Sequence, residues 1–334
     1  MSDGSNDGHH DGHDDASPRG TMRAITQDRL GDPDVLTLTD VPRPEPLPTE
    51  VLVRVRAAGV NPVDLSTREG GGMADVIGPP PFTVGWDVAG TVEATGRGVT
   101  TLAVGDDVFG MPWFPRRAGA YAAYVTAPSR HFARTPPGTG HAQAAALPLA
   151  GLTAWQTLVD TARVGPGQHV LVHAAAGGVG HLAVQIAKAR GARVTGTARA
   201  DKHAFLRGLG ADAVVDYTRV AFEQAVRDAD VVLDLVGGAE HQRRSLDALR
   251  PGGLLIAVPG SLDPAVAEEA AGRGLRATGF LVEPDRAGLD ALAALVADGR
   301  LRTEVGAVLP LAEAAEAHRR VASRRTTGKI VLTV

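Results

Sequence analysis

The chain has 334 residues, of which 44% are hydrophobic, and a formal net charge of −4. This length is sufficient for two packed units, each with its own core. There is no cysteine, which excludes disulfides, thiolate nucleophiles, iron–sulfur clusters and every zinc site that needs sulfur. Five aspartates and one arginine in residues 1–21 account for the whole net charge. The remainder is neutral, so we expect neither a nucleic acid nor a membrane as a partner.

Residues 1–21 are mostly Gly, Asp, Ser, Asn and His, and this composition predicts a disordered tail. No basic region followed by an apolar run is present, so we predict no secretory signal and a cytoplasmic protein. From Met22 onward, short strands and turns are expected. Residues 51–57 alternate apolar and charged side chains, as a half-buried strand does. We predict a loop at 61–81 and further strands at 82–94, 107–109 and 120–126, which together indicate an all-β region.

The pattern changes near Ala142, where apolar strands begin to alternate with helix-length segments. Six strands are predicted, at residues 169–173, 193–197, 213–216, 230–235, 253–258 and 276–281. Segments 178–190, 201–210 and 239–249 have the length of helices. This alternation predicts an α/β fold with a doubly wound parallel sheet of the Rossmann type. Two amphipathic helices at 289–299 and 311–323 and a closing strand at 328–332 are expected to end the chain.

A glycine-rich turn joins the first of these strands to its helix. Ala175, Gly177 and Gly180 follow the dinucleotide-binding spacing, with Ala in the first glycine position, and Gly178 and Val179 lie between them. Gly177 would allow backbone N–H groups to approach a pyrophosphate, and Gly180 would allow the helix to pack closely on the strand. The strand–turn–helix context favours a dinucleotide site over a turn without a ligand.

The end of the second strand indicates which dinucleotide is bound. A carboxylate there usually bonds the ribose 2′-hydroxyl of NAD. This strand ends at Thr197 without one, whereas Arg199 and Lys202 offer cations for the 2′-phosphate of NADP(H). We interpret Asp201 as the N-cap of the next helix. Arg199 could also be an ordinary solvated charge, so NADP(H) is the preferred cofactor rather than the only one allowed.

Several motifs occur in the order typical of one family: residues 58–64 (AGVNPVD), 85–90 (GWDVAG), 104–110 (VGDDVFG), 147–154 (LPLAGLTA), the Ala-Gly turn, and 208–212 (GLGAD). Over nearly all of residues 22–334 the sequence resembles the medium-chain dehydrogenases/reductases, specifically their zinc-independent, quinone-oxidoreductase-like branch. The resemblance implies a β-rich GroES-like substrate domain at 22–147, a Rossmann domain at 148–283 and a return of the substrate domain at 284–334. It also implies a homodimer.

The chain departs from the zinc-dependent relatives where their zinc ligands lie. The sequence Val60-Asn61-Pro62 stands where those relatives carry a Cys, and Trp86-Asp87 stands where they carry a His-Glu pair. We therefore expect no metal. Similar zinc-free relatives often have an aromatic hydroxyl after the Asn-Pro pair, whereas this chain has Ser66.

The resemblance supplies candidates for the site. Asn61 and Thr153 lie in motifs that line the nicotinamide end of the cleft, where they could orient the carboxamide or polarise an acceptor oxygen. Asp64 could position a proton or merely cap the loop. Tyr217, at the end of the third strand, could stack near the adenosine phosphate or be a plain strand-end aromatic. Val236, after the fourth strand, and Phe280, at the end of the sixth, complete the expected cofactor-binding residues.

Hydride transfer to a quinone or to an α,β-unsaturated carbonyl is the predicted reaction, since the chain offers neither metal nor thiol for another chemistry. An enoyl-thioester reductase is the first alternative, because residues 173–180 also resemble the enoyl-reductase domains of polyketide synthases. A non-catalytic NADPH-binding or sensor protein is the second alternative. The intact glycine turn and Asn-Pro loop favour an enzyme that acts on a small molecule.

Overall fold

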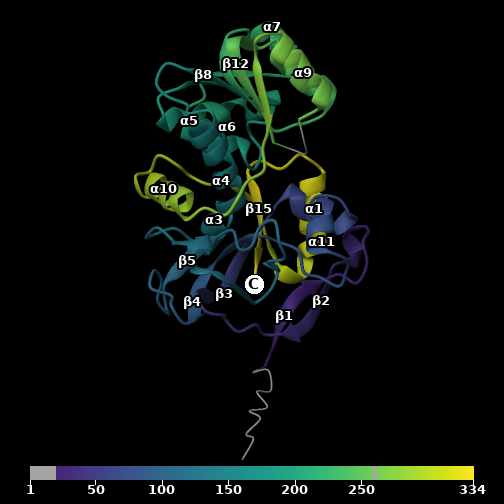
Figure 1. Ribbon diagram of the computed structural model, residues 1–334, viewed down its shortest axis with the longest axis vertical. Coiled ribbons are helices and arrows are strands. Elements are labelled where there is room, and N and C mark those ends of the chain that lie inside the picture. The colour runs from purple at the N-terminus through teal and green to yellow at the C-terminus, as the bar shows by residue number, and fades with distance from the viewer. Residues whose placement is uncertain (1–19, 259–261) are drawn as a thin grey trace, which may run out of the picture.

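The computed structural model describes residues 20–258 and 262–334. Figure 1 shows two parts stacked along the long axis of the molecule: an upper part built on a parallel sheet, and a lower, β-rich part. The C-terminal segment returns from the upper part to the lower one, where its final strand ends.

The parallel-sheet part contains six strands in the order β10-β9-β8-β11-β12-β13. Every neighbouring pair is parallel, and β8 lies next to both β9 and β11, so the chain moves outward in one direction and then crosses to the other. The strands are β8 (His169–Val172), β9 (Arg193–Thr197), β10 (Ala213–Val215), β11 (Ala229–Asp234), β12 (Leu249–Ala257) and β13 (Arg276–Gly279). The helices between them are α5 (Gly180–Ala189), α6 (His203–Gly208), α7 (Phe222–Ala225), α8 (Ala239–Leu246) and α9 (Pro264–Gly272). This is the predicted Rossmann arrangement.

The β-rich part has a seven-stranded sheet and a two-stranded one, β1-β2. In the larger sheet the order is β14-β15-β3-β4-β5-β7, and β6 also pairs with β3. The strands are β1 (Thr21–Thr26), β2 (Thr37–Pro42), β3 (Glu50–Val60), β4 (Asp87–Thr95), β5 (Asp107–Gly110), β6 (Tyr124–Pro128), β7 (Phe132–Arg134), β14 (Val305–Pro310) and β15 (Lys329–Thr333). Because β15 pairs antiparallel with β3, the last strand of the chain joins the sheet that β3 to β7 form.

The remaining helices connect or cover the sheets. They are α1 (Pro62–Glu69), α2 (Ala74–Ile77), α3 (His141–Ala145), α4 (Pro148–Trp155), α10 (Arg286–Ala297) and α11 (Ala314–Ala322), with a π-helical turn at Gln156–Thr161 and short 3₁₀ turns at Pro33–Val35, Ser129–His131, Ala200–Lys202 and Leu311–Glu313. Helices α4 and α10 approach closely, since a Cβ at Gly151 would lie 2.8 Å from Leu292 Cδ1.

Some sequence-based predictions were wrong. Residues 61–81 are not a loop, because they contain α1 and α2. The strand predicted at 82–94 begins only at Asp87, and the one predicted at 120–126 lies at Tyr124–Pro128. Asp201 is not an N-cap, since it lies inside the 3₁₀ turn that precedes α6. The predicted tail extends too far at its end, because Thr21 already belongs to β1, while residues 1–19 lie outside the described ones. The exact boundaries at 147/148 and 283/284 stay predictions.

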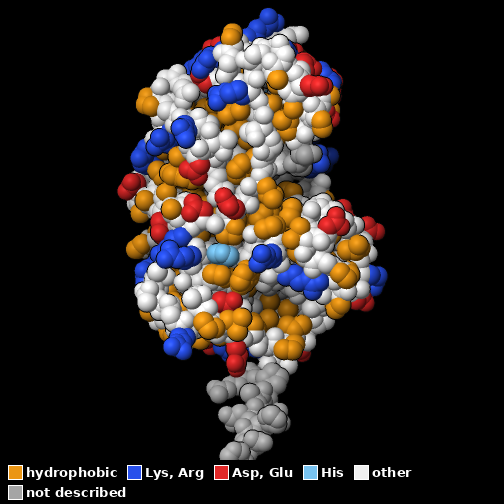
Figure 2. All heavy atoms as spheres, viewed as in Figure 1, with side chains coloured by type: hydrophobic (Ala, Val, Ile, Leu, Met, Phe, Trp, Pro, Cys, Tyr) orange, Lys and Arg blue, Asp and Glu red, His pale blue; other side chains and the backbone are white. Residues whose placement is uncertain are grey.

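Most of the buried hydrophobic side chains form one continuous cluster that runs through both parts. On the face shown in Figure 2, blue basic and red acidic side chains are interspersed among hydrophobic ones. None of the helices in 20–258 and 262–334 has both the length and the apolar character of a membrane span.

Candidate active site

The predicted glycine turn lies between β8 and α5 and is shaped by close backbone contacts. Ala174 adopts a positive φ of 46°, and the amide of Gly177 donates to its carbonyl at 2.9 Å. A Cβ at Gly180 would lie 2.4 Å from Ala174 O and 2.7 Å from Ala175 Cα, so no side chain fits there. Within the described part of the chain, the amides of Gly178 and Val179 have no hydrogen-bond acceptor. Free amides at a helix N-terminus fit the pyrophosphate of a dinucleotide.

The other expected cofactor residues follow the carboxyl ends of neighbouring parallel strands. Thr197 ends β9, Tyr217 follows β10, Val236 follows β11 and Phe280 follows β13. In a doubly wound sheet, ligands bind outside this edge. The structure therefore brings these residues to the same edge as the glycine turn. The Thr197 hydroxyl is buried and pairs with His173 Nδ1 at 3.1 Å, whereas Val236 is 42% exposed.

Two residues at this edge form a polar pair that is open to solvent. Arg199 is exposed, and its Nε donates to the Tyr217 hydroxyl at 3.2 Å. Tyr217 itself is 49% exposed. Lys202 lies one turn further along and is paired with Asp201 at 3.1 Å. The guanidinium of Arg199 thus keeps donors free for a phosphate, while Lys202 would have to leave its carboxylate to reach one.

Asn61 lies in a buried polar centre at the junction of β3 and α1. Its Nδ2 donates to Asp87 Oδ2 at 2.8 Å, and its Oδ1 accepts from the ammonium of Lys329. Lys329 Nζ also donates to Val60 O at 3.1 Å and to Asp87 Oδ2 at 3.2 Å. All three side chains are at most 3% exposed. A cation therefore bridges the side-chain amide of Asn61 and the carboxylate of Asp87.

Asp87 is anchored by the helix that also carries Thr153. Its Oδ1 accepts from the amide of Leu149, in the first turn of α4, at 2.7 Å. Thr153 is buried on the same helix, but its hydroxyl donates to Leu149 O at 2.7 Å. That hydroxyl hydrogen is engaged by its own helix, so only the lone pairs of the oxygen remain for a ligand.

Asp64 ends a buried chain of hydrogen bonds. Its Oδ2 accepts from the backbone N–H of Asn61 and from the Tyr121 hydroxyl, each at 2.8 Å. The Tyr121 oxygen lies 3.2 Å from His318 Nε2, and Arg68 donates to His318 Nδ1 at 2.9 Å. Because an arginine can only donate, Nδ1 must accept and the Nε2 hydrogen points to Tyr121. Burial raises the pKa of Asp64 to about 7 and lowers that of His318 to about 3.

The contact with the backbone amide of Asn61 gives Asp64 a capping role at the start of α1. The proton-positioning role of Asp64 stays a prediction. Four residues of these two networks were missed from the sequence. Lys329 lies 268 residues from Asn61 and His318 lies 250 residues from Arg68, and no local pattern links them. Tyr121 and Arg68 are buried polar residues whose partners only the tertiary fold reveals. After the Asn-Pro pair this chain has Ser66 in place of an aromatic hydroxyl. Tyr121, which comes from another part of the chain, supplies a phenol next to Asp64.

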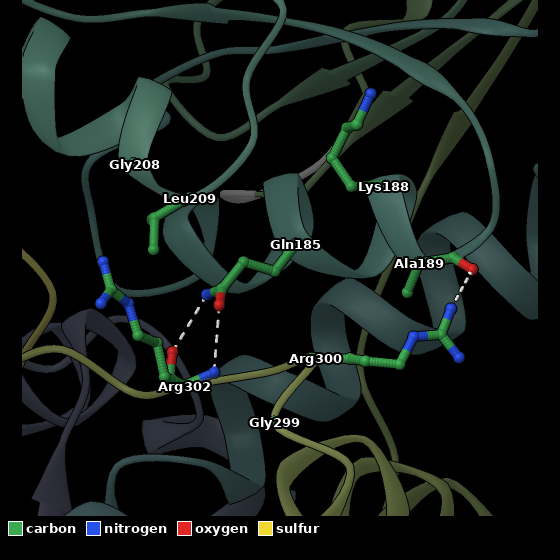
Figure 3. Close-up of a pocket in the computed structure, with 8 residues that line it drawn as sticks. All are labelled: Gln185, Lys188, Ala189, Gly208, Leu209, Gly299, Arg300 and Arg302. Atoms are coloured by element: carbon green, nitrogen blue, oxygen red, sulfur yellow. Dashed lines mark hydrogen bonds between the residues drawn. The ribbon is translucent and has the colours of Figure 1, made fainter.

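A surface hollow lies away from these residues. It has a volume of about 400 Å³ and lies between α5, α6 and the segment after α10. In Figure 3, Arg302 extends toward Gly208 and Leu209, whereas Arg300 extends the other way to the carbonyl of Ala189. None of the candidate site residues lines this hollow. Among the described residues, no group of three or more His, Cys, Asp or Glu side chains is arranged to hold a metal ion.

Comparison with known families agrees with this geometry. Residues 47–137 match the alcohol dehydrogenase GroES-like domain, and residues 209–332 match a family described as zinc-binding dehydrogenase. The 2-haloacrylate reductase of a Burkholderia species is 35% identical over 326 residues, which cover 90% of this chain and 96% of that protein. The pikromycin polyketide synthase component PikAII of Streptomyces venezuelae is 40% identical over 307 residues, but this chain spans only 8% of its length.

Solved structures show the same relationship. The quinone oxidoreductase of Coxiella burnetii superposes with a TM-score of 0.88 at 38% identity, covering 94% of this chain and 100% of that one. The chain belongs to the zinc-independent, quinone-oxidoreductase-like branch of the medium-chain dehydrogenases/reductases. It is an enzyme of a family of NAD(P)-dependent oxidoreductases that act on small molecules.

Two further structures bear on the cofactor and on the acceptor. A mycobacterial protein solved in complex with NADPH has a TM-score of 0.82 at 33% identity, over 94% of this chain and 100% of that one. The CurK enoyl reductase has a TM-score of 0.85 at 28% identity, over 93% and 99%. The family description that mentions zinc does not carry a zinc site to this chain, because the chain contains no cysteine and Lys329 bonds both Asn61 and Asp87.

Proposed function

We propose that the protein uses NADPH to reduce a quinone or an α,β-unsaturated carbonyl compound, with Asn61 as the hydrogen-bond donor at the reacting end of the cleft. The relatives named 2-haloacrylate reductase and quinone oxidoreductase support these two substrate classes, since an acrylate is itself an α,β-unsaturated acid. When bound, NADPH would supply the hydride. The chain's own residues bind, orient and exclude water.

The observation that carries this proposal is the reach of one side chain. A Cβ at Gly178, in the dinucleotide turn, would lie 3.0 Å from Lys329 Cδ, and the ammonium of the same lysine bonds Asn61. A single lysine side chain therefore connects the side-chain amide of Asn61 to the turn that is predicted to bind the pyrophosphate. A buried hydrogen-bond donor near the cofactor-binding turn can stabilise negative charge on an acceptor oxygen.

NADPH is the proposed cofactor because Arg199 is placed by Tyr217 with free donors and β9 has no carboxylate at its end. A charge-assisted hydrogen bond to phosphate contributes about 1.5–3 kcal/mol, so Arg199→Gln should weaken NADPH binding at least tenfold and leave NADH binding unchanged. Titration of both nucleotides measures this. Arg207→Gln, an exposed arginine on α6, is the matched control and should change neither affinity. Equal NADPH and NADH affinities in the wild type would contradict the proposal.

The substrate class is tested by following NADPH consumption with quinones, enones, haloacrylates and enoyl thioesters in parallel. We expect turnover with quinones or enones that exceeds turnover with thioesters. An enoyl-thioester reductase is the second candidate, favoured by the 40% identity to a segment of a polyketide synthase component and by the CurK enoyl reductase structure. Faster turnover of thioesters would select it. NADPH binding without turnover of any acceptor would indicate a binding protein instead.

We also propose, from the family resemblance, that the enzyme is a cytoplasmic homodimer. The strand β13 lies at one edge of the parallel sheet, with no partner strand on its outer side among the described residues. Sedimentation or light scattering measures the mass, and the monomer mass of 34.5 kDa would exclude the dimer.

A further inference from the structure

Lys329 is a buried cation with all its hydrogens engaged. It is the first residue of β15 and is 3% exposed. Its ammonium has three N–H groups, and three acceptors surround it: Val60 O, Asn61 Oδ1 and Asp87 Oδ2. Burying a lysine is costly unless it is paired in this way, and an apolar side chain would serve for packing alone. The contacts of Lys329 therefore point to a role in the polar centre.

These contacts decide which way the Asn61 amide faces. The ammonium can only donate, so it holds the oxygen of the amide, and the Asp87 carboxylate can only accept, so it holds the nitrogen. The reversed amide would place its NH₂ against the ammonium and its oxygen against the carboxylate. Among the described residues, only one of the two Nδ2 hydrogens has an acceptor. The group that the amide leaves open is consequently an N–H donor rather than a carbonyl.

The stem of Lys329 rests on the dinucleotide turn. A Cβ at Gly178 would lie 3.0 Å from Lys329 Cδ and 3.7 Å from Gly328 O. The amide of Gly328 donates to Ala176 O at 2.9 Å, which fixes the start of β15 on the same turn. At Gly177, by contrast, a Cβ would meet only the Ala174 carbonyl, at 3.2 Å. Gly178 thus leaves space for the side chain of Lys329, whereas Gly177 faces only the backbone of its own turn.

We propose that Lys329 is a positioning residue for the reduction, which orients the Asn61 amide as a donor and, through its seat on Gly178, couples that orientation to the turn that binds the cofactor. This inference rests on the proposed function, since it assigns Asn61 its role at the acceptor. Lys329 touches neither the acceptor nor the reacting atoms in this scheme. It acts through Asn61.

The test separates chemistry from cofactor binding. Lys329→Met keeps the stem but removes the ammonium, and it should lower kcat at least tenfold while the Kd for NADPH changes less than threefold. Gly178→Ala should lower kcat severalfold by displacing the stem, again with little change in the NADPH Kd. Gly177→Ala, its neighbour, should instead raise the NADPH Kd. Lys188→Met, which removes a half-buried lysine of α5 that pairs with Asp212, is the matched control and should leave both constants unchanged.

Lys329→Met leaves the Asp87 carboxylate buried without its cation, which could prevent folding. The double variant Lys329→Met with Asp87→Asn removes both charges and should show the same loss of kcat in a folded protein. Wild-type kcat in either variant, or an equal change of kcat and NADPH Kd in Gly178→Ala and Gly177→Ala, would overturn the inference.

A second readout does not depend on turnover. The side-chain amide of Asn61 in ¹⁵N–¹H spectra, assigned by its loss in Asn61→Asp, should give one pair of cross-peaks in the wild type, and this pair should be shifted or doubled in Lys329→Met. An unchanged signal would overturn the inference even if no acceptor is found. A wild type that reduces no acceptor but gives the expected spectra would reject the proposed function alone.

Discussion

Asp64 is a carboxylate without access to solvent, and its two oxygens differ in their hydrogen bonds. Its Oδ2 accepts from the backbone N–H of Asn61 and from the Tyr121 hydroxyl, whereas Oδ1 is buried without a hydrogen-bond partner. Burial is the largest cause that raises its pKa, to about 7, and it outweighs the two hydrogen bonds that lower it. A proton on this group is therefore retained in the folded enzyme at a pH where the unfolded chain releases it.

This has a measurable consequence for stability. Because the folded pKa lies above the unfolded value of 3.8, the native state binds the extra proton between about pH 4 and 7, and stability contributed by Asp64 falls as the pH rises through that window. Asp64→Asn should remove this component, so the free energy of unfolding of the variant relative to the wild type should rise by about 2–3 kcal/mol between pH 5 and 8. Chemical denaturation at both pH values measures it.

Asp106 provides the matched control. It also accepts from a backbone amide three residues before it, that of Ala103, but at an exposed turn, and that hydrogen bond lowers its pKa. Asp106→Asn should therefore show no such gain between pH 5 and 8. If Asp64→Asn and Asp106→Asn behave alike, Asp64 is already ionised at pH 5 and the burial argument is wrong.

The element that carries Asn61 shows what local sequence can and cannot reveal. Pro62 at the first helical position and Gly70, with φ of 100°, at the C-terminal end are ordinary boundary signals of a helix. The eight residues of α1 include a buried Arg68, which obscures the apolar periodicity, and the segment was predicted as a loop. The turn between β8 and α5 was predicted well, because its glycines lie between a strongly apolar strand and a long helix. Short helices held by distant partners are the elements that local patterns miss.

The turn itself gives a prediction at this scale. The nearest atoms to a Cβ at Gly180 belong to the backbone of Ala174 and Ala175, at 2.4 and 2.7 Å, and backbone cannot move aside as a flexible side chain can. Gly180→Val should therefore displace the start of α5, cost about 1–3 kcal/mol of stability and weaken NADPH binding at least tenfold. Gly272→Val on α9, where a Cβ meets nothing within 4 Å, is the control. Normal NADPH binding by Gly180→Val would mean that the phosphates bind elsewhere.

At the scale of the whole molecule, the candidate site is completed where the chain returns from the parallel sheet to the seven-stranded sheet. The strand β15 brings Lys329 to Asn61, and α11 brings His318 to Arg68 and Tyr121. The family resemblance predicted that the substrate domain is split, but it did not name these partners. Pairings between segments about 250 residues apart leave no periodic trace in a single sequence. The Rossmann half could be predicted because most of its neighbouring strands follow one another in the chain, the crossover that places β11 beside β8 being the exception.

Two buried histidines join segments that lie far apart in the chain, and both are held in one neutral form. His181 accepts from the amide of Glu304 at Nε2, and His318 accepts from Arg68 at Nδ1, so a second ring proton would face a donor in each case. Burial is the largest cause that lowers the pKa values, to about 4 for His181 and about 3 for His318.

These folded pKa values lie below the unfolded value of 6.5. As the pH falls below 6.5, the two histidines therefore bind protons in the unfolded chain but not in the native state. The stability that depends on neutral histidines is present above pH 6.5 and is lost toward pH 4, by on the order of 1 kcal/mol per histidine per pH unit. His181→Gln should cost stability at pH 7 through its lost contacts, but its free energy of unfolding should fall less steeply than that of the wild type between pH 6.5 and 5. Denaturation curves at several pH values in this range measure both slopes. Equal slopes would show that His181 is protonated in the native enzyme, and the contact of α5 with the returning segment would then not depend on a neutral ring.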